Sequence, residues 1–382
     1  MGLPLGIALA LRGVGISLVD IDPGAVDAVN DGRMPFLEPG ASDALRSALD
    51  QQRIVATLDP AVISQADAVV VVIGTPVDEH LNPDPNTIPR TLTSVLAHLR
   101  SGQLIVLRST IYPGVTRLLE EMLDTAGLEI DVAFCPERIA EGRAMTELFE
   151  LPQIVGARTE SARLRAAELF EVLDDRVVFL EPEEAELAKL FTNTWRYIKF
   201  ATANQLFMMA NDYGLDYERI RQAVRWEYPR AADLPSAGFA AGPCLFKDTM
   251  QLAAFNNNNF TLGHAAMLVN EGLPLYLVSR LEAEFDLRSK CVGILGMAFK
   301  GESDDTRSSL SYKLKRILNF KAGATVCTDP YVTSDPSLSP VEDVLDRADI
   351  LIIGAPHDAY RGLKPSQPLV DIWNLTGNGT RV

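Results

Sequence analysis

Two stretches of the sequence, ADAVVVVIGTP at 66–76 and ADILIIGAP at 348–356, share one pattern. Each begins with Ala-Asp, continues as an apolar run and ends near a glycine and a proline. Continuous apolar runs of this length are typical of strands buried on both faces of a parallel sheet. A second, shorter similarity links Asp20–Pro23 with Thr328–Pro330. We interpret the repeat as a duplicated nucleotide-binding architecture, which predicts an α/β protein with two Rossmann-like, doubly wound lobes.

The rest of the chain fits two such lobes around a helical middle. Residues 1–180 and 288–382 alternate apolar runs with amphipathic stretches, whereas 181–287 is almost entirely helical. We therefore expect a long central helix from Pro182 that joins the lobes. Further strands are expected at Ile16–Asp20, Leu104–Leu107, Ile130–Phe134, Gln153–Val155, Val177–Leu180, Cys291–Leu295 and Ala324–Thr328, with a helix at Leu310–Phe320.

Composition excludes several classes of partner. The 382 residues carry a formal net charge of −16, and both nucleic acids and anionic membranes require a basic face. No apolar run reaches the roughly 18 residues of a membrane span. No basic leader with a cleavage site is recognisable at the start, so a cytoplasmic location is expected. The four cysteines and four histidines show no metal-binding spacing, so no metal is expected.

The first lobe carries part of a dinucleotide-binding pattern. Asp20 directly follows the apolar run Ile16–Val19, where a carboxylate can bind ribose hydroxyls and repel the extra phosphate of NADP. The position of Asp20 therefore predicts NAD as the cofactor. The alternative is that Asp20 is only a turn residue without a role in binding. Gly2 then corresponds to the last glycine of the fingerprint, at the start of its helix. The first strand and the two earlier glycines are not in this sequence, so we expect a gap between the strands that end at Asp20 and Ile73.

One cysteine lies in a loop suited to chemistry. Cys244 is part of GPCLFKD at 242–248, and the glycine and proline predict a loop that becomes a helix at the cysteine. A helix N-terminus and a nearby lysine, here Lys247, both stabilise a thiolate. In an NAD enzyme such a thiolate can capture an aldehyde as a thiohemiacetal, which a second hydride transfer converts to a thioester. Taken alone, the loop equally allows a structural cysteine.

A series of short motifs runs along the chain in a fixed order. Besides the cysteine loop, they are Gly2–Leu5, Glu38–Gly40, Gly74–Pro76, Arg108–Thr110, Pro136-Glu137 with Ala140–Gly142, Glu186–Asn193, Gly296–Lys300 and Asp305–Arg307. In this order and spacing the chain resembles the UDP-glucose/GDP-mannose dehydrogenase family over nearly its whole length. The cysteine loop reads Gly-Pro-Cys where many relatives have Gly-Gly-Ser-Cys or Gly-Gly-His-Cys, which leaves the preferred sugar open.

The resemblance implies roles for individual residues in catalysis. Cys244 matches the nucleophile of the family. Lys189 and Asn193 match the pair that stabilises the oxyanion, and their i, i+4 spacing places both on one helix face. Asp248 matches an acid that handles protons and the catalytic water, and Glu137 matches a general base or water-orienting group.

The resemblance also implies binding residues. Thr110 and Glu141 match residues that line the site near the nicotinamide, Lys300 and Arg307 match positions near the sugar and diphosphate, and Arg230 matches an arginine that reaches a neighbouring subunit. Thr110 also counts among the catalytic residues. Cofactor contacts are implied for Gly2, Asp20, Thr75, Pro76, Thr110, Glu141 and Arg307. Substrate contacts are implied for Glu137, Lys189, Asn193, Arg230 and Lys300.

The implied enzyme is an NAD-dependent nucleotide-sugar 6-dehydrogenase of polysaccharide biosynthesis. It would oxidise the C6 hydroxymethyl group of a UDP-sugar to a carboxylate through a cysteine-bound intermediate. Residues 1–180 would bind NAD, 181–287 would hold the dimer contacts and the cysteine loop, and 288–382 would bind the nucleotide sugar. At least a homodimer is expected.

Several alternatives stay open at this point. UDP-glucose, UDP-N-acetylmannosamine, UDP-N-acetylglucosamine and GDP-mannose are all candidate substrates, with a UDP-sugar favoured. A single-step β-hydroxyacid dehydrogenase is the second enzyme class, although it would have no second Rossmann lobe. A catalytically degenerate chain that binds nucleotide sugar without turnover is the third possibility.

Overall fold

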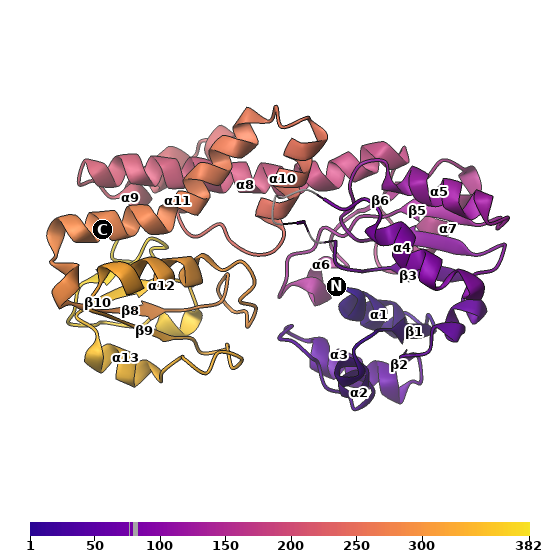
Figure 1. Cartoon of the computed structure of the whole chain (residues 1–382), viewed down its shortest axis with the longest axis horizontal. Helices are drawn as coiled ribbons and strands as arrows, with labels where there is room; N and C mark the ends of the chain where they lie inside the picture. Colours follow the sequence, from indigo (N-terminus) through magenta and orange to yellow (C-terminus); the bar gives the residue numbers. More distant parts are fainter. Residues whose placement is uncertain (76, 79–82) are drawn as a thin grey trace. The chain divides into compact units, whose positions relative to one another are not determined.

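The protein consists of two compact units (Figure 1). The computed structural model describes residues 1–75, 77–78 and 83–382. The first unit covers Met1–Thr192 and the second Asn193–Val382. Each contains a sheet built mainly from parallel strands, with helices packed against it. The predicted α/β fold with two Rossmann-like lobes is therefore confirmed, while the finer division at residues 180 and 287 stays a prediction.

The larger sheet of the first unit has the strand order β3-β4-β5-β6-β7. The strands are β3 (Ala68–Val71), β4 (Leu104–Leu107), β5 (Asp131–Phe134), β6 (Gln153–Gly156) and β7 (Val177–Leu180). All five were predicted from apolar runs. Neighbouring strands are parallel except β5 and β6, which meet antiparallel at Phe134 and Gly156.

Helices bury both faces of this sheet, which explains why β4 is apolar at every position. Its alternate residues Leu104 and Val106 pack with α7 (Glu160–Glu171), whereas Ile105 and Leu107 pack with α5 (Val115–Thr125). Helix α5 begins at Val115, directly after Gly114. The remaining helices of the unit are α1 (Gly2–Leu11), α2 (Pro23–Asn30), α3 (Ala41–Asp50), α4 (Thr87–Ser94), α6 (Ala144–Glu147), η1 (Pro60–Gln65) and η2 (Leu96–His98).

The expected gap in the sheet is present. β1 (Ile16–Val19) pairs only with β2 (Ile54–Thr57) in a separate two-stranded sheet, and among the described strands β3 pairs only with β4. Helix α1 contacts both sides of the gap, because its Leu5 and Leu9 belong to a core against which Ile16 of β1 and Val70 of β3 pack. β2 was not predicted, since its four residues alternate between buried and exposed and offer no continuous apolar run.

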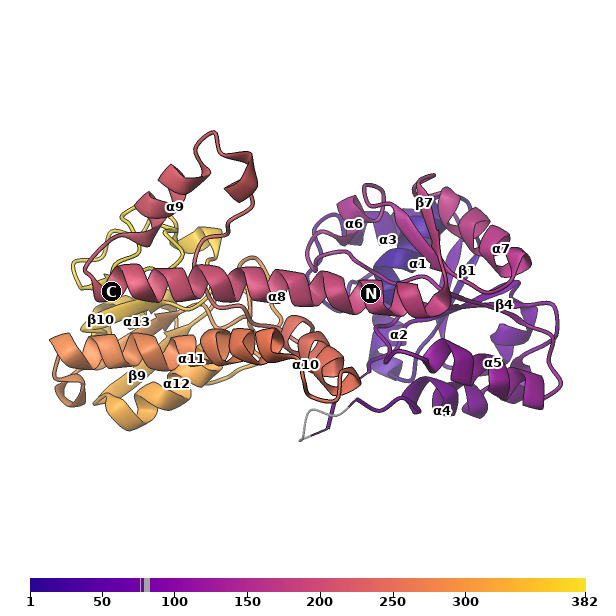
Figure 2. The same cartoon turned by 90° about the horizontal axis from the view of Figure 1, so that it is seen from above.

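A long helix, α8 (Pro182–Asp212), runs from the first unit into the second, as the sequence predicted. In the second unit it lies beside α11 (Thr261–Glu284) (Figure 2). Buried amides join them, because Asn204 Nδ2 donates to Asn270 Oδ1 at 2.9 Å and Asn270 Nδ2 donates to the carbonyl of Tyr197 at 3.1 Å. The other helices here are α9 (Tyr217–Arg225), η3 (Pro229–Ala231) and α10 (Leu245–Phe255).

The sheet of the second unit has the order β11-β10-β8-β9, and every pair is parallel. Its strands are β8 (Cys291–Leu295), β9 (Ala324–Thr328), β10 (Ile350–Ile353) and β11 (Leu369–Val370), with α12 (Leu310–Lys321), α13 (Val341–Arg347), η4 (Leu287–Ser289) and η5 (Asp358–Tyr360) around them. The first three strands match their predicted bounds. β11 was missed, since two residues give no usable pattern.

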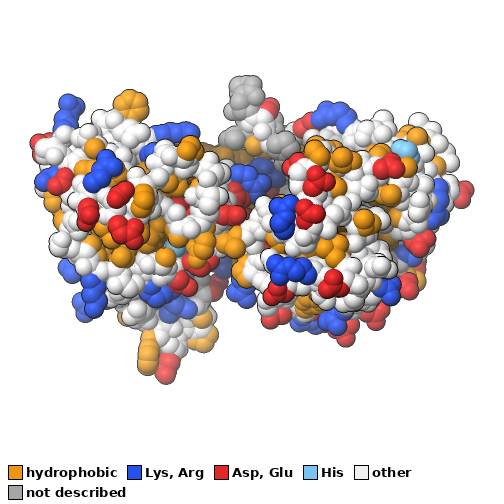
Figure 3. Space-filling model, turned by 90° about the horizontal axis from the view of Figure 1, so that it is seen from below, with side chains coloured by type: hydrophobic (Ala, Val, Ile, Leu, Met, Phe, Trp, Pro, Cys, Tyr) orange, Lys and Arg blue, Asp and Glu red, His pale blue; other side chains and the backbone are white. Residues whose placement is uncertain are grey.

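The face of the molecule drawn in Figure 3 carries side chains of both charges. Acidic and basic side chains are interspersed over the face of the described residues in Figure 3, which shows no continuous basic surface.

Among the described helices, none combines the length and the apolar character that crossing a membrane would require.

Candidate functional site

Exposure separates Cys244 from the other three cysteines. Burial raises the pKa of Cys135 to about 12 and that of Cys327 to about 11, and it also raises the pKa of Cys291. These thiols stay protonated and unreactive near neutral pH. Cys244 is exposed at the N-cap of α10, the position that the sequence predicted. A thiolate there faces the positive end of the helix dipole.

The loop before Cys244 is fixed at two glycines. Gly238 exchanges two hydrogen bonds with the side chain of Asn204, at 2.9 and 3.0 Å. Gly242 has a φ of 97°, and a Cβ there would lie 2.6 Å from the ring of Phe299, so only glycine fits. The Gly242 N–H also donates to the carbonyl of Ser308 at 3.3 Å. The cysteine therefore sits on a loop held by both α8 and the segment after β8.

A hydrogen bond joins two predicted site residues, Asp248 of α10 and Asn193 of α8. Asp248, one turn after Cys244, is fully buried and accepts a 2.5 Å hydrogen bond from Asn193 Nδ2 of α8. Its other oxygen lies 3.4 Å from Lys247 Nζ and has no hydrogen-bond partner among the described residues. A buried carboxylate with one unsatisfied oxygen can accept a proton or orient a water. Lys189 is buried one turn before Asn193 in α8, as the spacing predicted.

A buried glutamate anchors the start of α8. Glu186 accepts hydrogen bonds from the Gly114 and Thr116 backbone N–H groups, at 2.6 and 2.9 Å, and from the Thr116 hydroxyl at 2.6 Å. It thereby caps α5, and burial raises its pKa. Its effect is to hold the helix turn that leads to Lys189.

Glu137 is tied to an arginine that was not assigned to the site from the sequence. Arg108 donates to Glu137 Oε2 from Nη2 at 2.6 Å and from Nε at 3.0 Å, and both side chains are buried. Burial alone would raise the pKa of Glu137, but Arg108 and the N–H groups of Arg138 and Ile139 hold it below its usual value. These contacts favour a positioning role for Glu137 over proton transfer. Arg108 begins the motif Arg108–Thr110, which the sequence analysis recognised, and this motif was the signal that could have assigned Arg108 to the site.

Residues of the first unit suit a dinucleotide. Helix α1 begins at Gly2, as predicted, without a side-chain cap among the described residues, so its first N–H groups can hold an anionic pyrophosphate. Asp20 is exposed directly after β1. The Thr75 hydroxyl donates to the carbonyl of Thr110 at 2.6 Å, which links two predicted cofactor residues. Pro76 lies outside the described residues.

A buried acid supports the segment of Glu141. Glu38 accepts hydrogen bonds from the Gly142 and Ala144 N–H groups, at 3.0 and 2.8 Å. Glu141 itself is half-buried. The role of Glu38 was not assigned from the sequence, although its Glu-Pro-Gly motif was recognised.

The second unit also contains three predicted binding residues. Lys300 is half-buried, with its Nζ 5.7 Å from the centre of the Phe299 ring. Arg307 is exposed and forms a two-pronged ion pair with Asp305, at 2.6 to 3.0 Å. Arg230 is exposed in η3 and lies over the ring of Tyr228.

Known proteins share this architecture from end to end. Models of the UDP-glucose/GDP-mannose dehydrogenase family match its NAD-binding domain at residues 1–174, its central domain at 183–272 and its UDP-binding domain at 293–378. The UDP-N-acetyl-D-mannosamine dehydrogenase of Yersinia pestis is 28% identical over 96% of this chain and 93% of its own. The NDP-N-acetyl-D-galactosaminuronic acid dehydrogenase of Ralstonia nicotianae is 29% identical over 95% and 90%.

Solved structures agree with this assignment. A UDP-glucose dehydrogenase from Pyrobaculum islandicum superposes with a TM-score of 0.90 at 28% identity, covering 97% of this chain and 91% of that one. The chain therefore belongs to the UDP-glucose/GDP-mannose dehydrogenase family, and its cofactor is NAD.

Proposed function

We propose that the protein is a UDP-sugar 6-dehydrogenase that makes a uronic acid in two oxidation steps. One observation carries the proposal: in a member of this family, the exposed Cys244 stands at a helix N-terminus one turn from the buried Asn193–Asp248 pair. A one-step β-hydroxyacid dehydrogenase would use neither this cysteine nor the lobe formed by β8 to β11.

The proposed reaction has two oxidation steps, with a covalent intermediate on Cys244 between them. A hydroxymethyl group loses a proton and a hydride to give an aldehyde, to which the Cys244 thiolate adds as the carbonyl oxygen gains a proton. The thiohemiacetal then loses a second hydride and a proton to give a thioester. Water attacks the thioester carbon and the C–S bond breaks, releasing the carboxylate, the Cys244 thiolate and two protons. NAD, when bound, accepts each hydride, so one sugar reduces two NAD and takes its new oxygen from water.

Each residue near the cysteine has a proposed task. Asn193 and Lys189 stabilise negative charge on the sugar oxygen during thiol addition and hydrolysis. Asp248 uses its unsatisfied oxygen to orient the hydrolytic water. Glu137, held by Arg108, orients this water or acts as its base, and the ion pair supports the first of these tasks.

The remaining predicted residues would bind the ligands. Lys300 and Arg230 would contact the nucleotide sugar, and Arg307 a diphosphate. Gly2, Asp20, Thr75, Pro76, Thr110 and Glu141 would contact NAD. We also propose that the enzyme is cytoplasmic and takes part in polysaccharide biosynthesis. As predicted from the sequence, residues 1–180 would bind NAD, 181–287 would hold the dimer contacts and the cysteine loop, and 288–382 would bind the nucleotide sugar.

A substrate panel tests this function. The names of the Yersinia pestis and Ralstonia nicotianae relatives favour an N-acetylhexosamine, and the matched UDP-binding domain favours UDP as its nucleotide. We expect NADH formation with UDP-N-acetylmannosamine, UDP-N-acetylgalactosamine or UDP-N-acetylglucosamine to exceed that with UDP-glucose or GDP-mannose. NADH absorbance measured with the five compounds decides the point, and equal inactivity with all of them would contradict the proposal.

Asp20 provides a prediction about cofactor choice. Asp20→Ala removes the carboxylate that would bind the ribose hydroxyl and repel a 2′-phosphate, so the preference for NAD over NADP should fall by about 10- to 100-fold in kcat/KM. Asp59→Ala, an equally exposed acid after β2, is the matched control and should leave the preference unchanged. Equal use of NAD and NADP by the unaltered protein would show that Asp20 does not select the cofactor.

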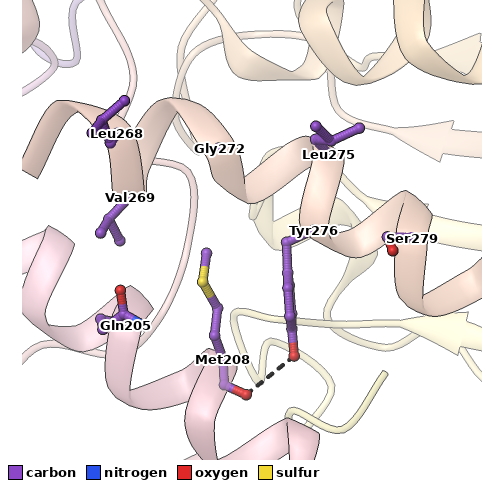
Figure 4. A pocket seen from close by; sticks show the side chains of 8 residues that line it. All are labelled: Gln205, Met208, Leu268, Val269, Gly272, Leu275, Tyr276 and Ser279. Carbon is purple, nitrogen blue, oxygen red and sulfur yellow. Dashed lines mark hydrogen bonds between the residues drawn. The ribbon is translucent and has the colours of Figure 1, made fainter. Parts of the chain in front are cut away.

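An apolar hollow between α8 and α11 supports a dimer (Figure 4). It encloses about 460 Å³ and is lined by Gln205, Met208, Leu268, Val269, Gly272, Leu275, Tyr276 and Ser279. Leu268 and Leu275 are more than half exposed, which favours burial against a second copy.

Mass in solution tests the dimer. Light scattering at micromolar concentration should give at least twice the chain mass of 41.7 kDa. The double change of Leu268 and Leu275 to Glu should reduce it to one chain, because each charge would lose its water in the interface. Leu164→Glu, an exposed leucine of α7, should not. A single-chain mass for the unaltered protein would refute the dimer.

A further inference from the structure

A fully buried histidine in the second unit has both ring nitrogens occupied. His357 Nδ1 accepts the Glu302 backbone N–H at 3.0 Å, and Nε2 lies 3.1 Å from Asp329 Oδ2. Because Nδ1 is an acceptor, the proton of the neutral ring is on Nε2 and is donated to Asp329. The ring therefore connects one backbone N–H to one buried carboxylate.

Asp329 holds the other end of the same loop. Its Oδ2 also accepts the backbone N–H groups of Met297 and Ala298, at 2.6 and 2.9 Å. The segment 296–302, here called the β8 loop, is thus tied near its start by Asp329 and at its end by His357. Asp329 belongs to the stretch Thr328–Pro330, which the sequence repeat linked with Asp20–Pro23.

The β8 loop is held in a conformation that needs such support. Glu302 has a φ of 55°, in the left-handed region that is unfavourable for any residue with a Cβ. A Cβ on Gly301 would lie 2.4 Å from the carbonyl oxygen of Pro356, so this loop and the segment before His357 are in close contact. Loss of a tie at Glu302 would let its backbone relax.

The same loop touches the cysteine loop and carries a proposed substrate residue. The Phe299 ring packs against Gly242, two residues before Cys244, and a Cβ on Gly242 would meet this ring at 2.6 Å. Lys300 follows directly in the chain. Movement of the β8 loop would therefore displace both the substrate lysine and one wall of the cysteine loop.

We propose that His357 is a positioning residue, which, through Asp329 and Glu302, sets the β8 loop so that Lys300 meets the nucleotide sugar and Phe299 supports the Cys244 loop. This role rests on the proposed function for the part that concerns Lys300. The part that concerns Cys244 stands on packing alone.

Graded variants test the two ties separately. His357→Asn keeps an acceptor near the position of Nδ1, His357→Gln keeps a donor near that of Nε2, and His357→Ala keeps neither. We expect KM for the nucleotide sugar and Kd for UDP to rise about tenfold or more with Ala and less with Asn or Gln. NAD affinity should stay at the parent value. His98→Ala, which removes a histidine of η2 in the first unit, is the control and should change neither constant.

A second readout does not depend on turnover. The rate of Cys244 alkylation by iodoacetamide should change at least threefold in His357→Ala and in Phe299→Leu, whereas only the histidine variant should lose UDP affinity. Folding of each variant is checked by its melting temperature, and Phe299→Leu serves if the histidine variants do not fold. If the parent does not bind UDP, the proposed function fails, while the alkylation test still stands. Parent-like UDP affinity and alkylation in folded His357→Ala would overturn the inference, as would a parent-like alkylation rate in Phe299→Leu.

Discussion

Cys244→Ala is expected to abolish formation of the acid product, lowering kcat by about 10⁴-fold or more while the Kd for the nucleotide sugar changes less than about threefold. The reason is that the second oxidation requires a covalent adduct, and no other cysteine of the chain combines exposure with a helix N-terminus. The variant also removes only one sulfur atom from an exposed position, so binding and folding should persist. Product analysis by mass spectrometry with calorimetric binding measures both effects.

Two further variants sharpen this test. Cys244→Ser should accumulate an ester-linked adduct, because an alkoxide leaves less readily than a thiolate. Cys291→Ala, on β8, is the matched control and should retain the parent kcat. Four-electron turnover by Cys244→Ala at the parent rate would exclude the covalent route.

The second large effect concerns the gap between β1 and β3. An apolar strand followed by Gly-x-Gly, about ten residues placed ahead of Gly2, should pair with both strands and extend the anion site at α1. Backbone groups of two strand edges would gain partners, each worth about 1 kcal/mol. We expect the melting temperature to rise by about 5 °C or more and the NAD affinity to rise at least about tenfold.

A matched extension separates the two gains. The same strand followed by Ala-x-Ala should raise the melting temperature but not the NAD affinity, because a Cβ keeps the backbone from the pyrophosphate. Scanning calorimetry and titration with NAD give both values. If the 382-residue chain already binds NAD as tightly and melts no lower than the extended one, Gly2 is not the last fingerprint glycine.

The sequence predicts the strands that form continuous apolar runs well and misses the two strands without such a run. β4, β8, β9 and β10 are apolar runs enclosed by helices, and their observed bounds equal the predicted ones. β2 and β11 depend on partners brought from elsewhere in the chain, so neither carries a local signal. The antiparallel contact of β5 and β6 joins Phe134 to Gly156, and the composition of these strands does not predict their orientation.

At the site, the functional residues could be predicted from the sequence, but their partners in space could not. The i, i+4 spacing paired Lys189 with Asn193, whereas the side chain of Asn193 donates a hydrogen bond to Asp248, 55 residues further along the chain. Likewise Glu137 was expected as a general base or a water-orienting group, and only the fold revealed its ion pair with Arg108. Such contacts arise from packing between distant segments, which periodicity cannot encode.

The stoichiometry of NADH tests the central claim most directly. With a limiting amount of the active UDP-sugar, the proposed function predicts two NADH for each sugar consumed and a product that carries a carboxylate. One NADH for each sugar with an aldehyde or ketone product would instead indicate a single-step dehydrogenase, and binding of the nucleotide sugar without NADH would indicate a binder. Either of these results would contradict the account.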